Sequence, residues 1–156
     1  MTHASDFTVL QLTPSDAVRV QGLLDVFSEA FDDPDTYDRA RPGPDYLRRL
    51  LGSDTFMALV AVQSDDVVGG LAAYELPKIE QERSEIYIYD LAVRASHRRR
   101  GVATALIRHL QALARQRGAW VVYVQADHGD DPAVALYTKL GVREDVMHFD
   151  LPVEGA

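Results

Sequence analysis

One crossover unit in the second half of the chain constrains the fold more than any other feature. Residues 85–93 alternate aromatic and β-branched side chains, and residues 120–126 form a second apolar run with strand composition. Between them, residues 102–117 carry apolar side chains at helical spacing and end at Gly118, which is typical of a helix C-terminus. A strand, a helix and a returning strand in this order form a parallel pair. The sequence therefore predicts that residues 85–93 and 120–126 are parallel neighbours in a sheet.

The rest of the chain shows the same two periodicities. We expect strands at residues 7–12, 56–63, 67–74 and 146–151, and helices at residues 14–30, 44–51 and 131–141. Residues 32–38 are acidic and contain Pro34, so they are expected to form a loop. The order β-α-α-β-β-β-α-β-α-β predicts an α/β or α+β class, with a mixed central sheet of about six strands flanked by about four helices.

Length and composition limit both the architecture and the chemistry. With 156 residues, of which 47% are hydrophobic and 26% charged, the chain is expected to form a single domain over residues 1–156. It contains no cysteine, which excludes a cysteine nucleophile, a thiolate zinc site and a cysteine-bound acyl intermediate, and is typical of a reducing compartment. No apolar run approaches the roughly 20 residues of a membrane helix, and the first six residues do not resemble a secretion signal. A cytoplasmic location is the simplest expectation.

Charge indicates which partners the protein favours. The net charge is −8, so binding to nucleic acid is not expected and a small cationic partner is favoured. The histidines have no metal-ligand spacing, and no metal site is expected.

A basic turn before the helix at residues 102–117 is the feature most suggestive of a ligand. Arg98, Arg99 and Arg100 lie next to a helix N-terminus, which already carries partial positive charge, so an anion would relieve the repulsion. Gly101 and Ala103 would let that anion approach the backbone closely. A pyrophosphate fits these demands, although a solvated basic turn is the alternative. Neither a P-loop nor a dinucleotide-binding glycine motif occurs.

The turn resembles the pyrophosphate loop of a known family. Arg98-x-x-Gly101-x-Ala103, after a strand that ends Asp90-Leu91-Ala92-Val93, is similar to the R/Q-x-x-G-x-G/A loop of the GCN5-related N-acetyltransferases (GNAT family), and the order of elements is similar from end to end. The resemblance implies a GNAT fold, acetyl-CoA as cosubstrate and two strands that splay apart beside the loop. It implies cofactor contacts from Leu91, Ala92, Val93, Arg98, Arg99, Arg100, Gly101, Val102, Ala103, Thr104, Asp131, Ala133, Leu136 and Tyr137.

A second segment extends the resemblance. Residues 130–141 are similar to the family's N-x-x-A-x-x-x-Y-x-x-x-G-F segment, in which the tyrosine can protonate the departing thiolate. Tyr137 matches that tyrosine. Asp131 replaces the usual asparagine and Val142 the usual aromatic residue, which puts the side-chain contact to the pantetheine region in doubt.

The longest matching runs resemble one branch of the family, the aminoglycoside 3-N-acetyltransferases. These runs are residues 69–78, 84–93, 98–101, 123–127 and 130–137. The resemblance implies acetylation of gentamicin-like antibiotics at the 3-amino group of 2-deoxystreptamine, antibiotic resistance and a homodimer. Aminoglycosides are polycations, so a carboxylate-rich cleft is expected. Its candidate linings are Asp32, Asp33, Asp35, Glu75, Glu80, Tyr87, Asp127, His128, Asp130 and Asp131.

The reaction needs a base, because an amine attacks a thioester only when it is neutral. Glu85 and Asp90 are the carboxylates on the central strand. Strand alternation places Glu85 on one face with Tyr87 and Tyr89 and places Asp90 on the other, unless a bulge near Tyr89 changes the phase, as the resemblance implies. Both carboxylates stay candidates.

The other expected roles follow from the same chemistry. A backbone N–H near Leu91 would hold the oxyanion, and Tyr137 would act as the acid. The absence of cysteine favours direct transfer over a covalent enzyme intermediate. Two alternatives stay open. One is a GNAT enzyme for another amine, such as a polyamine, an amino acid or a protein amine, and the other is a non-catalytic module that binds acyl-CoA.

Overall fold

The computed structural model describes residues 6–156 of the chain. Residues 1–5, which were considered above for a targeting signal, lie outside the described part. The chain divides into two compact units, Met1–Gln125 and Ala126–Ala156. Among residues 6–156, no helix is long and apolar enough to span a membrane.

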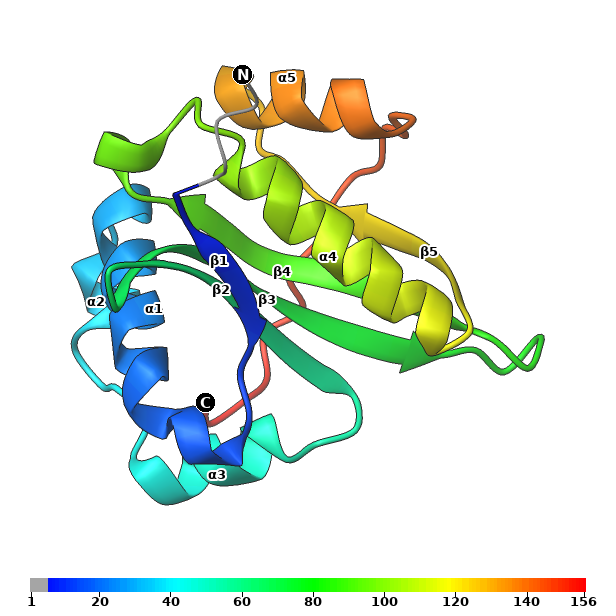
Figure 1. The fold of residues 1–156 in the computed structure, drawn as a ribbon. Coiled ribbons are helices and arrows are strands. Elements are labelled where there is room, and N and C mark those ends of the chain that lie inside the picture. The colour runs from blue at the N-terminus through cyan, green and yellow to red at the C-terminus, as the bar shows by residue number, and fades with distance from the viewer. Residues whose placement is uncertain (1–5) are drawn as a thin grey trace. The chain divides into compact units, whose positions relative to one another are not determined.

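The larger unit is built on one mixed sheet (Figure 1). Its order is β1-β2-β3-β4-β5. The strands are β1 (Thr8–Gln11), β2 (Phe56–Gln63), β3 (Asp66–Pro77), β4 (Ser84–Val93) and β5 (Ala119–Val124). Strands β1 to β4 are antiparallel neighbours, and β5 runs parallel to β4. The parallel pair predicted from the crossover unit is therefore confirmed.

Helices cover both faces of this sheet. They are the short 3-10 turn η1 (Pro14–Asp16), α1 (Ala17–Phe31), α2 (Pro34–Tyr37), α3 (Pro44–Leu51), the 3-10 turn η2 (Ala95–His97) and α4 (Val102–Gln116). A Cβ added at Gly69 would meet Val102 of α4, whereas one added at Gly70 would meet Leu23 of α1. Adjacent strand residues point to opposite faces, so α1 and α4 lie on opposite sides of the sheet.

This layering buries a hydrophobic core between the sheet and α1. On the α1 side, the buried cluster includes Leu23 and Phe27 with Val60 of β2 and Leu47 of α3.

The turn between β2 and β3 is tight because Ser64 and Asp65 adopt positive φ angles of 49° and 67°, which suits the twist of a hairpin.

The acidic segment expected to be a loop contains a short helix, so that prediction was wrong for residues 34–37. Asp33 caps α2 by accepting a hydrogen bond from the Thr36 backbone N–H at 3.1 Å, and Pro34 occupies the first turn. An aspartate cap followed by proline is a helix-start signal. The sequence therefore carried a start signal for this helix, but four residues are too few to show helical periodicity.

The smaller unit contains one regular element, α5 (Asp131–Leu140), among its residues 126–156. The helix expected at residues 131–141 is confirmed. The sixth strand expected at residues 146–151 is wrong, because these residues form no strand. Apolar and polar residues do alternate here, but the apolar side chains are exposed: Met147 by 83%, Phe149 by 73% and Leu151 by 86%. A strand requires backbone hydrogen bonds to a neighbour, which alternation alone does not provide.

Candidate active site

A β-bulge in β4 arranges the candidate site. Ala72 of β3 pairs with Asp90, but the next residue, Ala73, pairs with Ile88, so Tyr89 is the extra residue. Residues that are paired across antiparallel strands share a face, and a bulge changes the alternation by one position. Asp90 therefore lies on the same face as Tyr87, whose partner is Tyr74. The bulge considered from the sequence is present, and it removes the expected separation of Asp90 from Tyr87.

Asp90 meets a residue that the sequence analysis did not consider. Tyr37, at the end of α2, donates a hydrogen bond from its hydroxyl to Asp90 Oδ1 at 3.0 Å. Burial raises the pKa of Asp90 above its usual range, while the Tyr37 hydrogen bond acts in the opposite direction. The pKa of Tyr37 is also raised, first by burial and then by the Asp90 charge, so the phenol stays protonated and remains a donor.

Aromatic rings continue from Asp90 across the sheet face. Tyr74 and Tyr89 lie with ring centroids 6.1 Å apart, and Tyr89 and Tyr87 lie 5.8 Å apart. The Tyr87 ring stacks on Tyr123 of β5 at 4.8 Å. Tyr74, Asp90 and Tyr46 of α3 also line a mainly apolar cavity of about 140 Å³. The rings offer π-faces, which attract ammonium groups, beside a carboxylate.

Glu85 has a different environment from Asp90. Lys78 Nζ lies 3.6 Å from Glu85 Oε1 and 3.5 Å from Glu80 Oε1, so one cation neutralises both carboxylates in part. Glu85 also contributes to the raised pKa of Tyr123, although burial is the larger cause. Both central-strand carboxylates are therefore near the tyrosine row, which consists of Tyr74, Tyr89, Tyr87 and Tyr123. Of these two carboxylates, only Glu85 pairs with a lysine within residues 6–125.

Glu75 is engaged within the fold. Its carboxylate accepts a hydrogen bond from Ser84 Oγ at 2.7 Å and forms an ion pair with Arg117, which follows α4. Arg117 also donates to the backbone carbonyl of Asp54. These contacts tie β3 to the loop before β2 and leave Glu75 little freedom to turn toward a ligand.

The other acidic candidates divide between the two units. Asp32 ends α1 in the left-handed conformation, Asp33 caps α2, and Asp35 is exposed in the first turn of α2. Asp127, His128 and Asp130 belong to the smaller unit, where the Asp130 side chain accepts from the Ala133 N–H at 3.4 Å and caps α5. The first group thus precedes Tyr37 directly on the larger unit.

The basic turn has the backbone of an anion site. Arg99 has φ 61° and Gly101 has φ 79°, and Gly101 is the N-cap of α4. An added Cβ at Gly101 would meet nothing within 4 Å, so crowding does not explain the glycine. The left-handed conformation does, because glycine adopts it without steric cost. The first turn of α4 contains no acidic residue, and its leading N–H groups lack acceptors within the helix. Arg98, Arg99 and Arg100 are exposed around it.

The two central strands separate next to this turn. Pairing between β4 and β5 ends at Ile88 and Val124, while β4 continues to Val93. The end of β4, with Leu91, Ala92 and Val93, therefore has no partner on the β5 side among residues 6–125. This opening lies between the bulge and the basic turn, where the splayed strands were expected.

Tyr137 lies in the second turn of α5. Burial, and then the charge of Asp130, raise the pKa of its phenol to about 12, so it holds its proton at neutral pH. Asp131, Ala133 and Leu136, the other α5 residues expected to contact a cofactor, lie on the same helix.

The sequence analysis missed two tyrosines that face the Asp90 carboxylate. Tyr74 was included only in a strand, and Tyr37 only in a loop. The distance in sequence between Tyr37 and Asp90 explains the second omission, since nothing local to residues 34–37 indicates a contact with β4. The odd position of a tyrosine in an otherwise acidic segment was the only available signal.

Comparison with known proteins places these features in context. Residues 21–142 match the model of the acetyltransferase (GNAT) family. A streptothricin acetyltransferase from Streptomyces lavendulae is 28% identical, over 90% of this chain and 83% of its own length. The structure of an aminoglycoside acetyltransferase, HMB0005, from an uncultured soil metagenomic sample is 58% identical with a TM-score of 0.93, covering 95% of this chain and 99% of that one.

A further structure contains a ligand. The aminoglycoside acetyltransferase meta-AAC0020, also from a soil metagenomic sample, was solved in complex with sisomicin. It is 28% identical with a TM-score of 0.86, and the match covers 95% of this chain and 97% of that one.

The burial of Asp90 predicts a stability cost at neutral pH. Because its folded-state pKa is raised, the folded protein binds the proton more tightly than the unfolded chain, and stability falls as pH rises from about 4, the ordinary aspartate value, through the raised pKa. Asp90→Asn should therefore increase the free energy of unfolding at pH 7, and this gain should shrink toward pH 4. Urea unfolding at several pH values measures it. Glu82→Gln, at an exposed carboxylate, is the control for loss of one negative charge. A variant less stable than wild type at pH 7 would contradict the prediction.

Proposed function

The chain belongs to the GNAT family of acetyltransferases, and from that premise we propose that it transfers the acetyl group of acetyl-CoA to an amine of an aminoglycoside. The finer proposal is the 3-amino group of 2-deoxystreptamine in gentamicin-like antibiotics, an activity that would confer resistance. Support comes from the 58% identical aminoglycoside acetyltransferase and from the sisomicin complex of a second relative. The homodimer and the cytoplasmic location expected from the sequence belong to the same proposal.

The observation that carries the proposal is the face created by the β4 bulge. Asp90 and the tyrosine row lie together on that face, beside the acidic α2 segment and the opening between β4 and β5. Carboxylates attract a polycation over distance, and tyrosine faces attract ammonium groups at contact. A ligand with several amines on a compact sugar scaffold suits this combination better than a protein terminus with a single amine.

Acetyl-CoA would be held by main-chain and basic groups. The N–H groups of Val102, Ala103 and Thr104 at the start of α4 would bind the pyrophosphate, with Arg98 to Arg100 supplying positive charge. The bound cosubstrate supplies an activated acetyl group, and the free edge of β4 beyond Ile88 would hold its arm. The Leu91 N–H is the proposed donor to the thioester oxygen as negative charge develops there.

The proton balance assigns one task to each remaining group. A carboxylate accepts the first proton that the ammonium loses, and the free amine then forms the C–N bond to the thioester carbon. The C–S bond breaks as the thiolate receives a proton from the acid, and the nitrogen loses its second proton, which restores the acid. We assign the first task to Asp90, because its raised pKa brings it toward the range in which a base operates and because Lys78 partly neutralises Glu85. Tyr137 is the proposed acid. Transfer is direct, since the chain has no cysteine to carry the acetyl group.

A panel of amines tests the substrate class. Release of CoA thiol from acetyl-CoA should occur with gentamicin, sisomicin and kanamycin but not with spermidine or a lysine-containing peptide, because only the aminoglycosides combine several amines with a sugar scaffold. The protein contributes no thiols to the titration. NMR of the gentamicin product should show the acetyl group on the 3-amino nitrogen. Turnover only with spermidine or the peptide would mean that the acceptor is a different amine. Binding of CoA without turnover of any amine would favour the non-catalytic module.

Paired substitutions decide which carboxylate is the base. Asp90→Asn should lower kcat with gentamicin by roughly 10²–10⁴-fold, the usual range for loss of a general base. Glu85→Gln removes the same charge from the same strand and should affect KM more than kcat, as a substrate contact does. Steady-state kinetics at saturating acetyl-CoA measure both. The reverse pattern would transfer the role to Glu85.

Removing the phenol tests the proposed acid. Tyr137→Phe should lower kcat by roughly 10²-fold while leaving KM for acetyl-CoA within a few-fold, because the ring stays and only the proton donor is lost. Equal kcat values for Tyr137→Phe and wild type would remove Tyr137 from the mechanism.

A further inference from the structure

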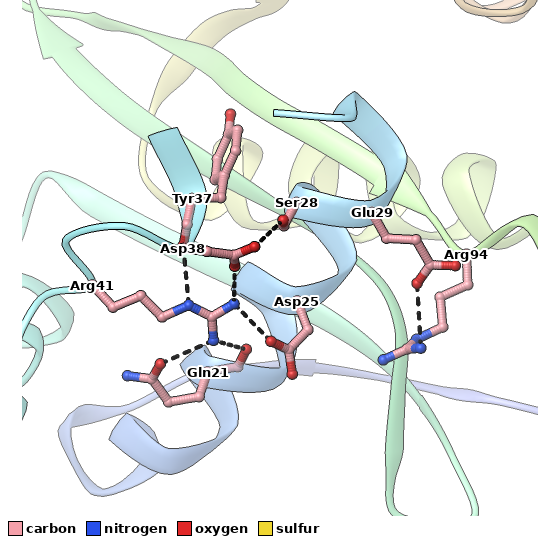
Figure 2. A network of polar contacts seen from close by, with 8 residues as sticks. All are labelled: Gln21, Asp25, Ser28, Glu29, Tyr37, Asp38, Arg41 and Arg94. Atoms are coloured by element: carbon pink, nitrogen blue, oxygen red, sulfur yellow. Dashed lines mark hydrogen bonds and ion pairs between the residues drawn. The ribbon is translucent and has the colours of Figure 1, made fainter. Parts of the chain in front are cut away.

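Arg41, which follows α2, lies at the centre of a polar network that binds this segment to α1 (Figure 2). Its Nη2 donates to Asp25 Oδ1 at 2.6 Å and to Asp38 Oδ1 at 2.7 Å. Its Nη1 donates to the backbone carbonyl and the side-chain oxygen of Gln21, at 3.3 and 3.2 Å. A planar guanidinium can serve these acceptors at once, whereas an ammonium group cannot.

The same guanidinium holds the main chain of Tyr37. Arg41 Nε donates to the Tyr37 carbonyl oxygen at 3.0 Å. The Tyr37 ring points away from the guanidinium (Figure 2) and packs against Phe27 and Phe31 of α1, with centroids 5.8 and 5.6 Å away. Its hydroxyl then reaches Asp90. Arg41 and Asp90 thus bind opposite ends of one residue.

Helix α2 is too short to position Tyr37 by itself. It contains four residues, and a helix of that length gains little from its own hydrogen bonds. Ser28 of α1 donates to Asp38 at 2.6 Å, which fixes one of the carboxylates that Arg41 binds. The location of the Tyr37 backbone is therefore set by side chains from α1 that meet at Arg41.

We propose that Arg41 is a positioning residue of the acetyl-transfer site, which fixes the Tyr37 main chain so that its phenol donates to Asp90. The functional part of this inference rests on the proposed function, in which Asp90 is the base. The structural part is that Arg41 controls the protonation of the Asp90 carboxyl through Tyr37. This part does not depend on any substrate.

The expected consequence is a change at Asp90, although Arg41 does not touch it. The Tyr37 hydrogen bond favours the charged carboxylate, so a displaced Tyr37 should leave burial unopposed and increase the pKa of Asp90. The groups that face Asp90 are tyrosines: Tyr37 from α2, Tyr74 from β3 and Tyr87 from β4, with Tyr46 of α3 across the cavity. The charges that face Arg41 are Asp25 of α1 and Asp38 after α2. Loss of Arg41 leaves those two carboxylates without their cation.

Direct titration of the Asp90 carboxyl carbon by ¹³C NMR, on the protein without substrate, tests this inference. Wild type, Tyr37→Phe, Arg41→Ala and the double variant are compared. We expect both single variants to raise the pKa of Asp90, and the double variant to match Tyr37→Phe, because Arg41 acts through Tyr37. Arg48→Ala removes an arginine on α3 that pairs with Asp45, and it should leave Asp90 unchanged.

Two results would overturn the inference: an unchanged Asp90 titration in Arg41→Ala, or a double variant whose shift equals the sum of the two single shifts. Arg41→Lys keeps the charge but not the fork, and it should fall between wild type and Arg41→Ala. If Arg41→Ala does not fold, Asp38→Asn weakens the same network from the other side and should shift Asp90 in the same direction.

Kinetics separate this inference from the proposed function. If Asp90 is the base, the acidic limb of the kcat profile with gentamicin should move to higher pH in Arg41→Ala, with less change in KM for acetyl-CoA. A merely structural role would lower the amount of active protein and leave the limb in place. An NMR shift at Asp90 combined with full activity of Asp90→Asn would support the positioning of Tyr37 and reject Asp90 as the base.

Discussion

The extra residue in β4 determines which side chains share a face of the sheet with Asp90. Without the bulge at Tyr89, strand alternation would direct Asp90 toward the α4 side, away from Tyr37 and the tyrosine row. With it, a carboxylate, several phenols and the acidic α2 segment share one face of the sheet. The same strand then continues to Val93 beyond the end of its pairing with β5. One irregularity and one early end of pairing thus place a candidate base beside an open strand edge that leads to the basic turn.

The basic turn and the surroundings of Asp90 differ in their electrostatics. Around the basic turn, arginines lie next to the positive end of α4, which disfavours the fold unless an anion is bound. Around Asp90, burial disfavours the charged carboxylate, and the neighbours are neutral phenols. Both arrangements reduce the stability of the free protein and would be relieved by ligands of opposite sign, which are the proposed anionic cosubstrate at the basic turn and the proposed cationic acceptor at Asp90. This pattern is typical of functional sites rather than of structural ion pairs.

The sequence predicted the frame of the fold and the location of the basic turn, because both depend on local signals. Periodicity, a helix-ending glycine and the crossover rule were sufficient for β4, α4 and β5. The bulge had no local signature and was considered only through resemblance to a family. The contact between Tyr37 and Asp90 joins residues 53 positions apart, and the role of Arg41 depends on side chains from α1, so neither was visible in a linear pattern. The expected strand at residues 146–151 failed for the opposite reason, since a correct local pattern met no partner strand.

The most direct test of the account is a crystal structure of the protein with CoA and gentamicin bound together. The account predicts the pyrophosphate at the N-terminus of α4, the sugar rings against the tyrosine row, and the 3-amino nitrogen within hydrogen-bond distance of Asp90, whose other contact is Tyr37. A complex in which gentamicin lies away from the bulged face of β4, with its nearest amine facing Glu85 or no carboxylate at all, would contradict it.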